Sequence, residues 1–197
     1  MTILRLMTLS AAALAAGCVS LLPETQPPSP RYALTAPSPT LEGPVVTSGV
    51  AVARPTSLAA LDTAAVAVVR GGHRIAYRSG LEWSDRAPRL LQTMIVRTLE
   101  NTEKFPNAGR RGDAAGADYR LMTDIRHFEE VDDDRREAYV SLRVALHDAR
   151  TGRIAGAMVI EEREAFTGGP DELIAAFDAA NKRAMARIAQ FVQETAA

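Results

Sequence analysis

The residue types with the most chemical potential in this sequence are its only cysteine, Cys18, and its three histidines, His73, His127 and His147. The histidines stand singly, and no H-x-x-x-H or H-E-x-x-H pair would bring two of them to one helix face to bind zinc. A single cysteine can form neither a disulfide within the chain nor a cysteine cluster around a metal. We therefore predict no metal site, and we interpret the histidines as surface or packing residues.

Hydrolytic chemistry requires a nucleophile within reach of a base, and the serines offer no such pattern. Ser57, Ser79, Ser84 and Ser141 lie in no G-x-S-x-G turn, and no histidine adjoins a nucleophile motif. The acidic run 132–134 lacks the spacing and the central glycine of an EF-hand calcium loop, which favours a solvated hairpin loop. We predict that the chain has no catalytic residue and is not an enzyme.

Cys18 closes an N-terminal segment with the features of a secretory signal. Arg5 is the only charged residue among residues 1–17, and an uncharged, mostly apolar run follows it up to Ala16. Gly17 and Cys18 then supply the small residues of a cleavage site. The apolar run is about half the roughly 20 residues that a membrane-spanning helix needs. We predict a signal peptide over residues 1–17, with cleavage between Gly17 and Cys18.

The residues before this cut, LAAGC over positions 14–18, resemble the lipobox of bacterial lipoproteins, with Ala15 where leucine is usual. The resemblance implies that diacylglycerol is joined to the thiol of Cys18 and that an N-acyl chain such as palmitate is added to its new amine. Several acyl chains on one residue meet the requirement for stable membrane anchoring. The alternative is an ordinary secretory signal, which would leave a free thiol in an oxidising compartment. No other cofactor is predicted.

The residue after Cys18 bears on the destination of the anchored protein. An aspartate there retains lipoproteins at the inner membrane of many Gram-negative cells, and this chain has Val19. We therefore expect it on the periplasmic face of the outer membrane, with inner-membrane anchoring as the alternative. Loss of Arg5 with the signal changes the formal net charge from −1 to −2. That small charge gives no electrostatic reason to expect a nucleic-acid partner.

Proline divides the mature chain into a tether and a domain. Between positions 18 and 44 the prolines are Pro23, Pro27, Pro28, Pro30, Pro37, Pro39 and Pro44. Such a density forbids a helix, so we predict an extended, solvated tether over residues 18–44 with one short strand at 32–34. The remaining residues, 45–197, have the size of one domain with one core.

Residue periodicity predicts the elements of that domain. Alternation and β-branched residues predict six strands, over residues 45–54, 65–70, 74–78, 118–130, 138–149 and 153–166. The dipeptide Gly71-Gly72 permits the positive φ of a hairpin turn between the second and third. Apolar residues at three- and four-residue spacing predict a helix from Pro88 to near Asn101 and another from near Pro170, and residues 102–116 are expected to be loop.

These elements predict the fold class α+β. We expect an antiparallel sheet with two helices packed on one face, an α/β sandwich that follows the signal peptide and the Pro-rich tether. The alternation is strongest over residues 138–149, where Val140, Leu142, Val144 and Leu146 share one face. The other face of the sheet is left for solvent, a partner or another subunit.

The order of these parts resembles one family, the ABC-type transport auxiliary lipoproteins that accompany mammalian-cell-entry (MCE) domain lipid transporters. The segments that carry the resemblance are 32–34 (YAL), 54–62 (RPTSLAALD), 74–77 (RIAY), 83–92 (WSDRAPRLLQ) and 117–121 (ADYRL). They extend over nearly the whole mature chain. Ala87 departs from the pattern, in which a leucine often precedes the proline.

The resemblance implies a non-enzymatic accessory subunit of an ABC transport system for lipids or hydrophobic solutes. Its partners would be an MCE-domain protein, a permease and an ATPase, and it would dock the MCE component at the envelope. Tyr32, Leu34 and Trp83 are candidate partner-binding residues, because a tryptophan in a loop can anchor an interface. For Trp83 the alternative is packing over the domain's own helix. For function the alternative is a structural or assembly lipoprotein of the cell envelope.

Overall fold

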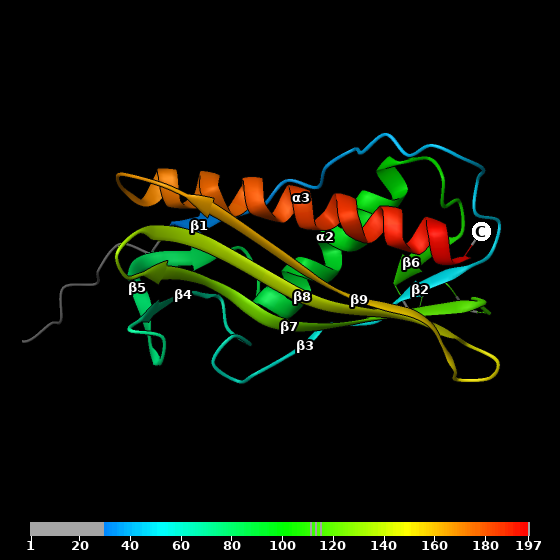
Figure 1. The fold of residues 1–197 in the computed structure, drawn as a ribbon, viewed down its shortest axis with the longest axis horizontal. Coiled ribbons are helices and arrows are strands. Elements are labelled where there is room, and N and C mark those ends of the chain that lie inside the picture. The colour runs from blue at the N-terminus through cyan, green and yellow to red at the C-terminus, as the bar shows by residue number, and fades with distance from the viewer. Residues whose placement is uncertain (1–29, 111, 113, 115, 197) are drawn as a thin grey trace, which may run out of the picture.

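The computed structural model describes residues 30–110, 112, 114 and 116–196. In chain order the strands are β1 (Arg31–Tyr32), β2 (Val50–Val52), β3 (Thr56–Ser57), β4 (Ala65–Arg70), β5 (Arg74–Trp83), β6 (Ala108–Arg110), β7 (Tyr119–Asp132), β8 (Arg136–Asp148) and β9 (Ile154–Ala165). The helices are α2 (Ala87–Asn101) and α3 (Pro170–Ala196). The described residues thus form an α+β fold with one nine-stranded sheet (Figure 1).

The long strand β7 organises the sheet. One of its edges pairs with β8 in antiparallel fashion from Tyr119↔Asp148 to Asp132↔Arg136, and β8 pairs with β9 in the same way. The other edge of β7 pairs in turn with β2, β3 and β4, each of them parallel. The expected antiparallel sheet is therefore confirmed for the long strands, while the short strands add parallel pairs that we did not predict.

The hairpin between β4 and β5 forms where it was predicted. Gly71 and Gly72 have φ values of +58° and +72°, a region that suits glycine and gives the tight turn. Val69 pairs with Ile75 and Arg70 with Arg74 across it. The free second edge of β5 receives β1, so that the sheet ends with the first strand of the described chain.

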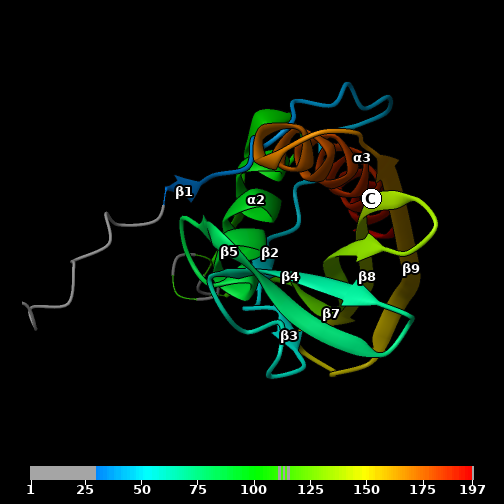
Figure 2. The same cartoon turned by 90° about the vertical axis from the view of Figure 1, so that its left-hand side faces the viewer.

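Both helices lie on the same side of the sheet, as expected (Figure 2). α3 packs on β8 and β9, and α2 packs on α3 and on the short strands β2 and β6. The four predicted core residues of β8, from Val140 to Leu146, are fully buried beneath them. α3 begins at Pro170, with Asp171 and Glu172 in its first turn, where negative charge is favourable.

An aromatic cluster holds the centre of the core. Trp83 lies 5.2 Å from Phe128 and 5.0 Å from Phe177, ring centroid to centroid, so the cluster joins β5, β7 and α3. All three side chains are at most 1% exposed. Aromatic rings at these separations add to the stabilisation that burial of their apolar surface supplies.

The described part of the Pro-rich segment lies along the helices. Leu34 and Val46 are buried, and the Thr35 N–H donates to Asp178 Oδ1 on α3 at 2.6 Å. Gln193 of α3 donates to the carbonyl oxygen of Pro44 at 3.0 Å. Residues 31–46 therefore contact the domain, although their prolines suggested a solvated chain. The three-residue strand β6 also lies inside the stretch 102–116, which we expected to be loop.

Candidate docking surface

The predicted site residues have three different locations. Gly17 and Cys18 lie outside the described residues. Trp83 belongs to the aromatic core cluster and Leu34 is 6% exposed, so neither presents its side chain to a partner in this structure. For Trp83, this location agrees with packing over the domain's own helix, which was the alternative to a role in partner binding. Tyr32 is half-buried in the edge strand β1, where it pairs with Trp83 across the backbone.

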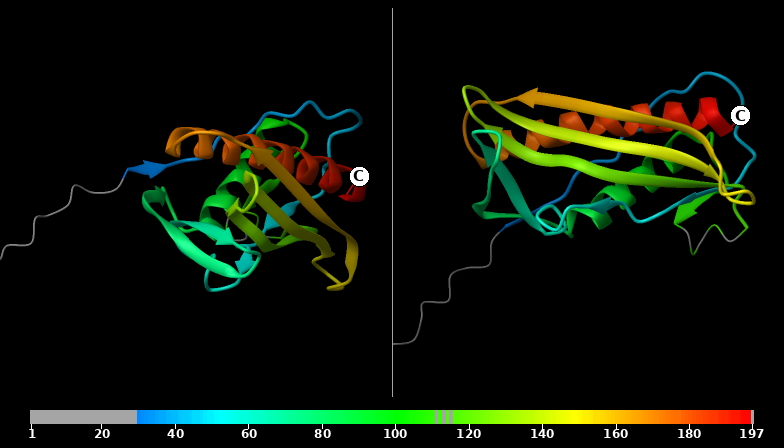
Figure 3. Two further views of the ribbon diagram at one scale, coloured as in Figure 1. Left: turned by 60° about the vertical axis from the view of Figure 1, so that its left-hand side comes forward. Right: turned by 60° about the horizontal axis from the view of Figure 1, so that its bottom comes forward.

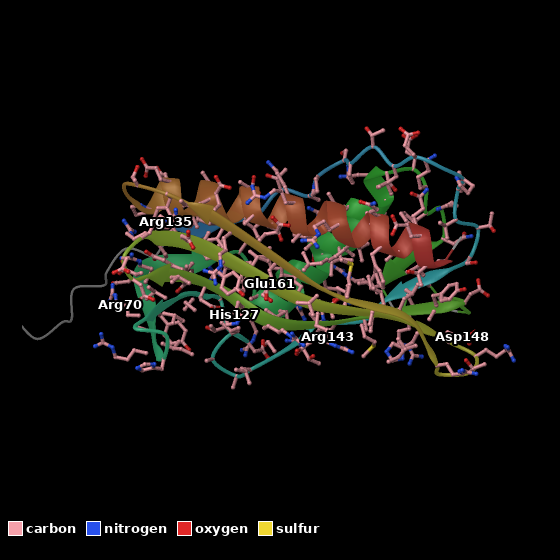
Figure 4. The ribbon with its side chains drawn as sticks, in the orientation of Figure 1. Arg70, His127, Arg135, Arg143, Asp148 and Glu161 are labelled. Atoms are coloured by element: carbon pink, nitrogen blue, oxygen red, sulfur yellow. The ribbon has the colours of Figure 1, made fainter. Side chains whose placement is uncertain are left out.

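The broadest candidate surface is the side of β7, β8 and β9 that the helices leave uncovered. We call it the open face and define it by these residues: Arg120, Met122, Asp124, His127, Glu129, Tyr139, Ser141, Arg143, Ala145, His147, Ala157, Val159, Glu161 and Arg163. Side chains of alternate residues share one face of a strand, which separates this set from the core residues of the same strands. His127, Arg143 and Glu161 show its position in Figure 4.

Cross-strand pairing arranges the open face in rows. Asp124 pairs with Arg143 and then with Val159, whereas His127 pairs with Ser141 and then with Glu161. A third row consists of Glu129, Tyr139 and Arg163. Each of these three rows contains ionisable side chains, so the face combines both signs of charge instead of one large field.

The most ordered part of the open face is a stack of three side chains. The rings of His127 and Tyr139 lie 4.5 Å apart, and the guanidinium carbon of Arg163 lies 3.5 Å from the centre of the tyrosine ring. His127 Nδ1 is 2.5 Å from Glu129 Oε1, and Arg163 Nη1 is 3.2 Å from Glu137 Oε2. Because carboxylates hold both ends, the stack presents a fixed shape to solvent.

Apolar side chains accompany this polar stack. Met122 is 37% exposed and Val159 is 39% exposed, while Ala145, which pairs with Met122, is buried on β8. Ser141 is also buried on β8, and its hydroxyl has no hydrogen-bond partner among the described residues. An apolar centre within a charged surround is typical of a protein interface.

A separate pocket of about 430 Å³ lies beside the start of α3. Its lining includes Arg78, Arg136 and the segment 168–170. Both arginines contact Glu130, whose side chain is fully buried, so their charges are neutralised inside the domain. This arrangement makes the pocket a structural ion-pair site and a weaker candidate for a ligand than the open face.

Among the described residues, no three His, Cys, Asp or Glu side chains gather in a way that could hold a metal ion. Within the same part of the chain, neither helix has the length and apolar character needed to cross a membrane.

Comparison with known proteins assigns the chain to a family. The model of the ABC-type transport auxiliary lipoprotein component family matches residues 32–189. This chain belongs to that family. The auxiliary lipoprotein is also 28% identical to an uncharacterized protein of Bradyrhizobium diazoefficiens over 139 residues, which are 70% of this chain and 37% of that protein. It thus spans little more than a third of the length of that relative.

Solved structures share the fold of the auxiliary lipoprotein. A crystal structure of a protein from Xanthomonas campestris superimposes with a TM-score of 0.79 at 20% identity, covering 84% of this chain and 95% of that one. A hypothetical protein from Chlamydia trachomatis gives a TM-score of 0.54 at 11% identity, covering 76% and 98%. At these identities the likeness shows the fold alone.

Asp62, the last residue of the segment 54–62, has a structural task in the auxiliary lipoprotein. Arg86, just before α2, donates from Nε to Asp62 Oδ1 at 2.8 Å, and its Nη2 contacts the Asp62 carbonyl oxygen. Arg54 adds a second ion pair at 3.3 Å. The hydrogen bond from Arg86 lowers the pKa of Asp62 below its ordinary value, and the charge of Arg54 acts in the same direction. Asp62 therefore ties the end of β2 and the loop after β3 to the start of α2.

Replacing Asp62 with asparagine should weaken this tie in a pH-dependent way. Because the folded-state pKa is lowered, the carboxylate contributes stability above its unfolded pKa of about 3.9, and the contribution is lost as the pH falls through the folded value. The pair is partly solvated, so we expect a loss of about 0.5–1 kcal/mol at pH 7. Urea unfolding at pH 7 and at pH 3 should show the difference from wild type shrinking in acid.

The control for this measurement is Asp134→Asn at the exposed β7–β8 turn. It removes the same charge without breaking an ion pair, and it should leave stability within about 0.5 kcal/mol of wild type. An equal loss of stability at pH 7 and at pH 3 in the Asp62 variant would show that the charge of the carboxylate does not stabilise the contact with Arg54 and Arg86.

Proposed function

We propose that this lipoprotein is a non-enzymatic accessory subunit of an MCE-type ABC transport system for lipids or hydrophobic solutes. In this proposal its open face binds the MCE-domain protein, which works with a permease and a cytoplasmic ATPase. Membership of the auxiliary family supports a role in ABC transport. The observation that carries the docking role is the open face itself, a three-strand surface that neither helix covers.

The chemistry of the open face supports a protein partner. Met122 and Val159 supply apolar contact area, while Arg143 and Glu161 provide charges of both signs around it. Mixed charges at the rim of an interface select the partner and its orientation more than they raise affinity. In the stack, the buried ring of Tyr139 supports the exposed side chains of His127 and Arg163, and arginine is among the residues enriched at binding hot spots.

The anchor completes the proposal. Acyl chains on Cys18 would hold the chain at the periplasmic face of the outer membrane. Thirteen residues lead from Cys18 to Arg31, the first residue of β1, and a fully extended chain of that length spans at most about 45 Å. The domain would therefore remain close to the membrane while its open face meets a partner from the periplasm.

The test is crosslinking in intact cells, followed by purification of the tagged full-length lipoprotein and mass spectrometry of the proteins that accompany it. An MCE-domain protein and its permease are the expected partners. The variant Arg143→Glu reverses a charge on the open face, next to the apolar Val159, and should lower their recovery at least tenfold. Arg150→Glu, in the β8–β9 turn, makes the same charge change outside the face and should not. Recovery of cell-wall proteins alone would instead support the envelope-assembly alternative.

A further inference from the structure

Strand β9 has a free edge. It pairs with β8 along one side from Ile154 to Ala165, and no strand of the described residues pairs with its other side. The right-hand view of Figure 3 shows β9 at the border of the sheet. A free edge of this length is a template for a further strand, and natural proteins usually obstruct it with charges, proline or a covering element.

Hydrogen bonding identifies the backbone groups that face this edge. The N–H of Phe166 donates to the carbonyl oxygen of Arg136 at 3.2 Å, so alternate residues from Phe166 to Gly156 direct their backbone groups toward β8. The N–H and C=O groups of Ala157, Val159 and Glu161 consequently face outward. Arg163 shares their direction, and its carbonyl oxygen accepts a hydrogen bond at 3.0 Å from Arg183 Nη2.

The two halves of the edge differ sharply in charge. Near the C-terminal end of β9, two arginines of α3 form ion pairs with its glutamates. Arg183 pairs with Glu162 at 2.9 Å and with Glu164 at 2.9 Å, and Arg187 pairs with Glu162 at 3.2 Å. These ion pairs obstruct the approach of another strand. The first seven residues, Ile154 to Ile160, contain no charged residue and no proline. One half of β9 is therefore protected, and the other half is open to pairing.

We propose that two copies of this chain pair through these open halves, β9 against β9, in antiparallel register about a two-fold axis at Ala157. In this register each large side chain meets a small one near the axis: Gly156 lies opposite Met158 of the second copy, and Ala155 lies opposite Val159. Ala155 is the extra residue of the bulge in β9, where its methyl group leaves room for the valine. The edge is self-complementary, as a two-fold interface must be.

Charge at the ends of the paired segment supports the same register. Arg153 of one copy comes beside Glu161 of the other, and the symmetry repeats this pair at both ends. Both side chains are exposed and neither has an ion-pair partner among the described residues. A register centred on Val159 would instead place Glu161 opposite Ala157, which removes both ion pairs. The part of the β5 edge that β1 leaves unpaired is a poorer partner, because Arg74 and Arg78 lie along it.

The two-fold axis at Ala157 is perpendicular to the sheet. Both open faces therefore lie on one side of a continuous double sheet, and the two α3 helices lie together on the other. Because this contact joins two copies of the same chain, the self-pairing does not depend on which envelope protein binds the open face.

Disulfide trapping of the full-length lipoprotein in intact cells tests this pairing. The variant Ala157→Cys places a thiol at the axis, where hydrogen-bonded antiparallel residues have Cα atoms about 5.5 Å apart, within disulfide range. The native Cys18 is the predicted lipidation site, and the parent protein is the background control. Ala165→Cys lies on the same strand, eight residues from the axis, so two copies would hold these thiols roughly 50 Å apart. We expect a disulfide-linked dimer on a non-reducing gel for the variant at position 157, and at least tenfold less of this dimer for the variant at position 165.

A second variant separates pairing from adventitious oxidation. Ala157→Pro removes an N–H that faces the edge and leaves the β8 ladder intact, which is where a strand tolerates proline. The variant should remain folded, with a cooperative thermal transition, while sedimentation in detergent should show half the protein mass of wild type. Equal trapping at positions 157 and 165, a disulfide adduct of the Ala157→Cys variant with a different protein, or an unchanged mass for the proline variant would each overturn the self-pairing.

Discussion

Replacement of Glu130 with alanine is expected to lower the free energy of unfolding by about 3–5 kcal/mol. The Glu130 side chain is fully buried. Arg78 binds it through two nitrogen atoms, with Nε 2.5 Å from Oε2, and Arg136 donates from Nε to Oε1 at 3.0 Å. The hydrogen bond that Arg78 donates to Glu130 raises the pKa of Arg78, and arginine stays charged even without this partner. Two partly buried cations would then lose their shared counter-charge.

Chemical denaturation of the purified lipoprotein measures this loss. Glu130→Gln keeps the volume and one acceptor oxygen but removes the charge, and it should fall between alanine and wild type. Glu100→Ala truncates an exposed glutamate on α2 and should change stability by less than about 0.5 kcal/mol. If Glu130→Ala costs no more than Glu100→Ala, the buried ion pairs do not hold β5 and β8 to β7 as the structure indicates.

Replacement of Cys18 with alanine is expected to move the protein from the membrane to the soluble fraction. The alanine side chain has no thiol to receive diacylglycerol, and the proposed acyl chains would supply about 0.8 kcal/mol of membrane affinity for each buried CH₂ group. Membrane fractionation should show nearly complete release or an unprocessed precursor, and mass spectrometry should show that the lipid mass is missing.

The matched control changes the next small residue beyond the cut. Ser20→Ala leaves Cys18 and the residues before it untouched, so its lipid mass and membrane fraction should equal those of wild type. Membrane retention of a correctly cleaved Cys18→Ala protein would contradict the lipid anchor and would require a different attachment.

Much of the fold could be predicted because its long elements have clear periodicity. The alternation around Val140 and Leu142 identified β8 and its buried face, and the dipeptide Gly71-Gly72 identified the β4–β5 turn. The short strands β2, β3 and β4 pair parallel with successive parts of β7, and no local pattern encodes that arrangement. Parallel partners are chosen by tertiary packing across long loops, which short-range periodicity does not report.

The candidate site was less predictable than the fold. Strand alternation left the alternate residues of β8 for the uncovered side, but His127 was interpreted only as a surface or packing residue. Its stacking on Tyr139 depends on the register between β7 and β8, where a bulge between Ile125 and His127 changes which residues point outward. Trp83 was ambiguous for a related reason, because only the packing of α3 shows that its indole is enclosed.

Asp62 shows a third limit of sequence reasoning. Its segment contributed to the family resemblance, but its contacts with Arg54 and Arg86 require the end of β2, a loop and the start of α2 to meet. A carboxylate in a loop is usually solvated, so the residue type alone did not indicate a structural ion pair.

The most direct test of the open-face docking proposal is site-specific photo-crosslinking in intact cells. A photoreactive residue at Met122 lies on the open face, and the same residue at Gln190 lies on the exposed side of α3 and serves as the control. We predict that position 122 forms a covalent adduct with an MCE-domain protein and that position 190 does not. An MCE adduct at position 190 with none at position 122 would contradict docking through the open face, and adducts only with cell-wall proteins would contradict the transport role itself.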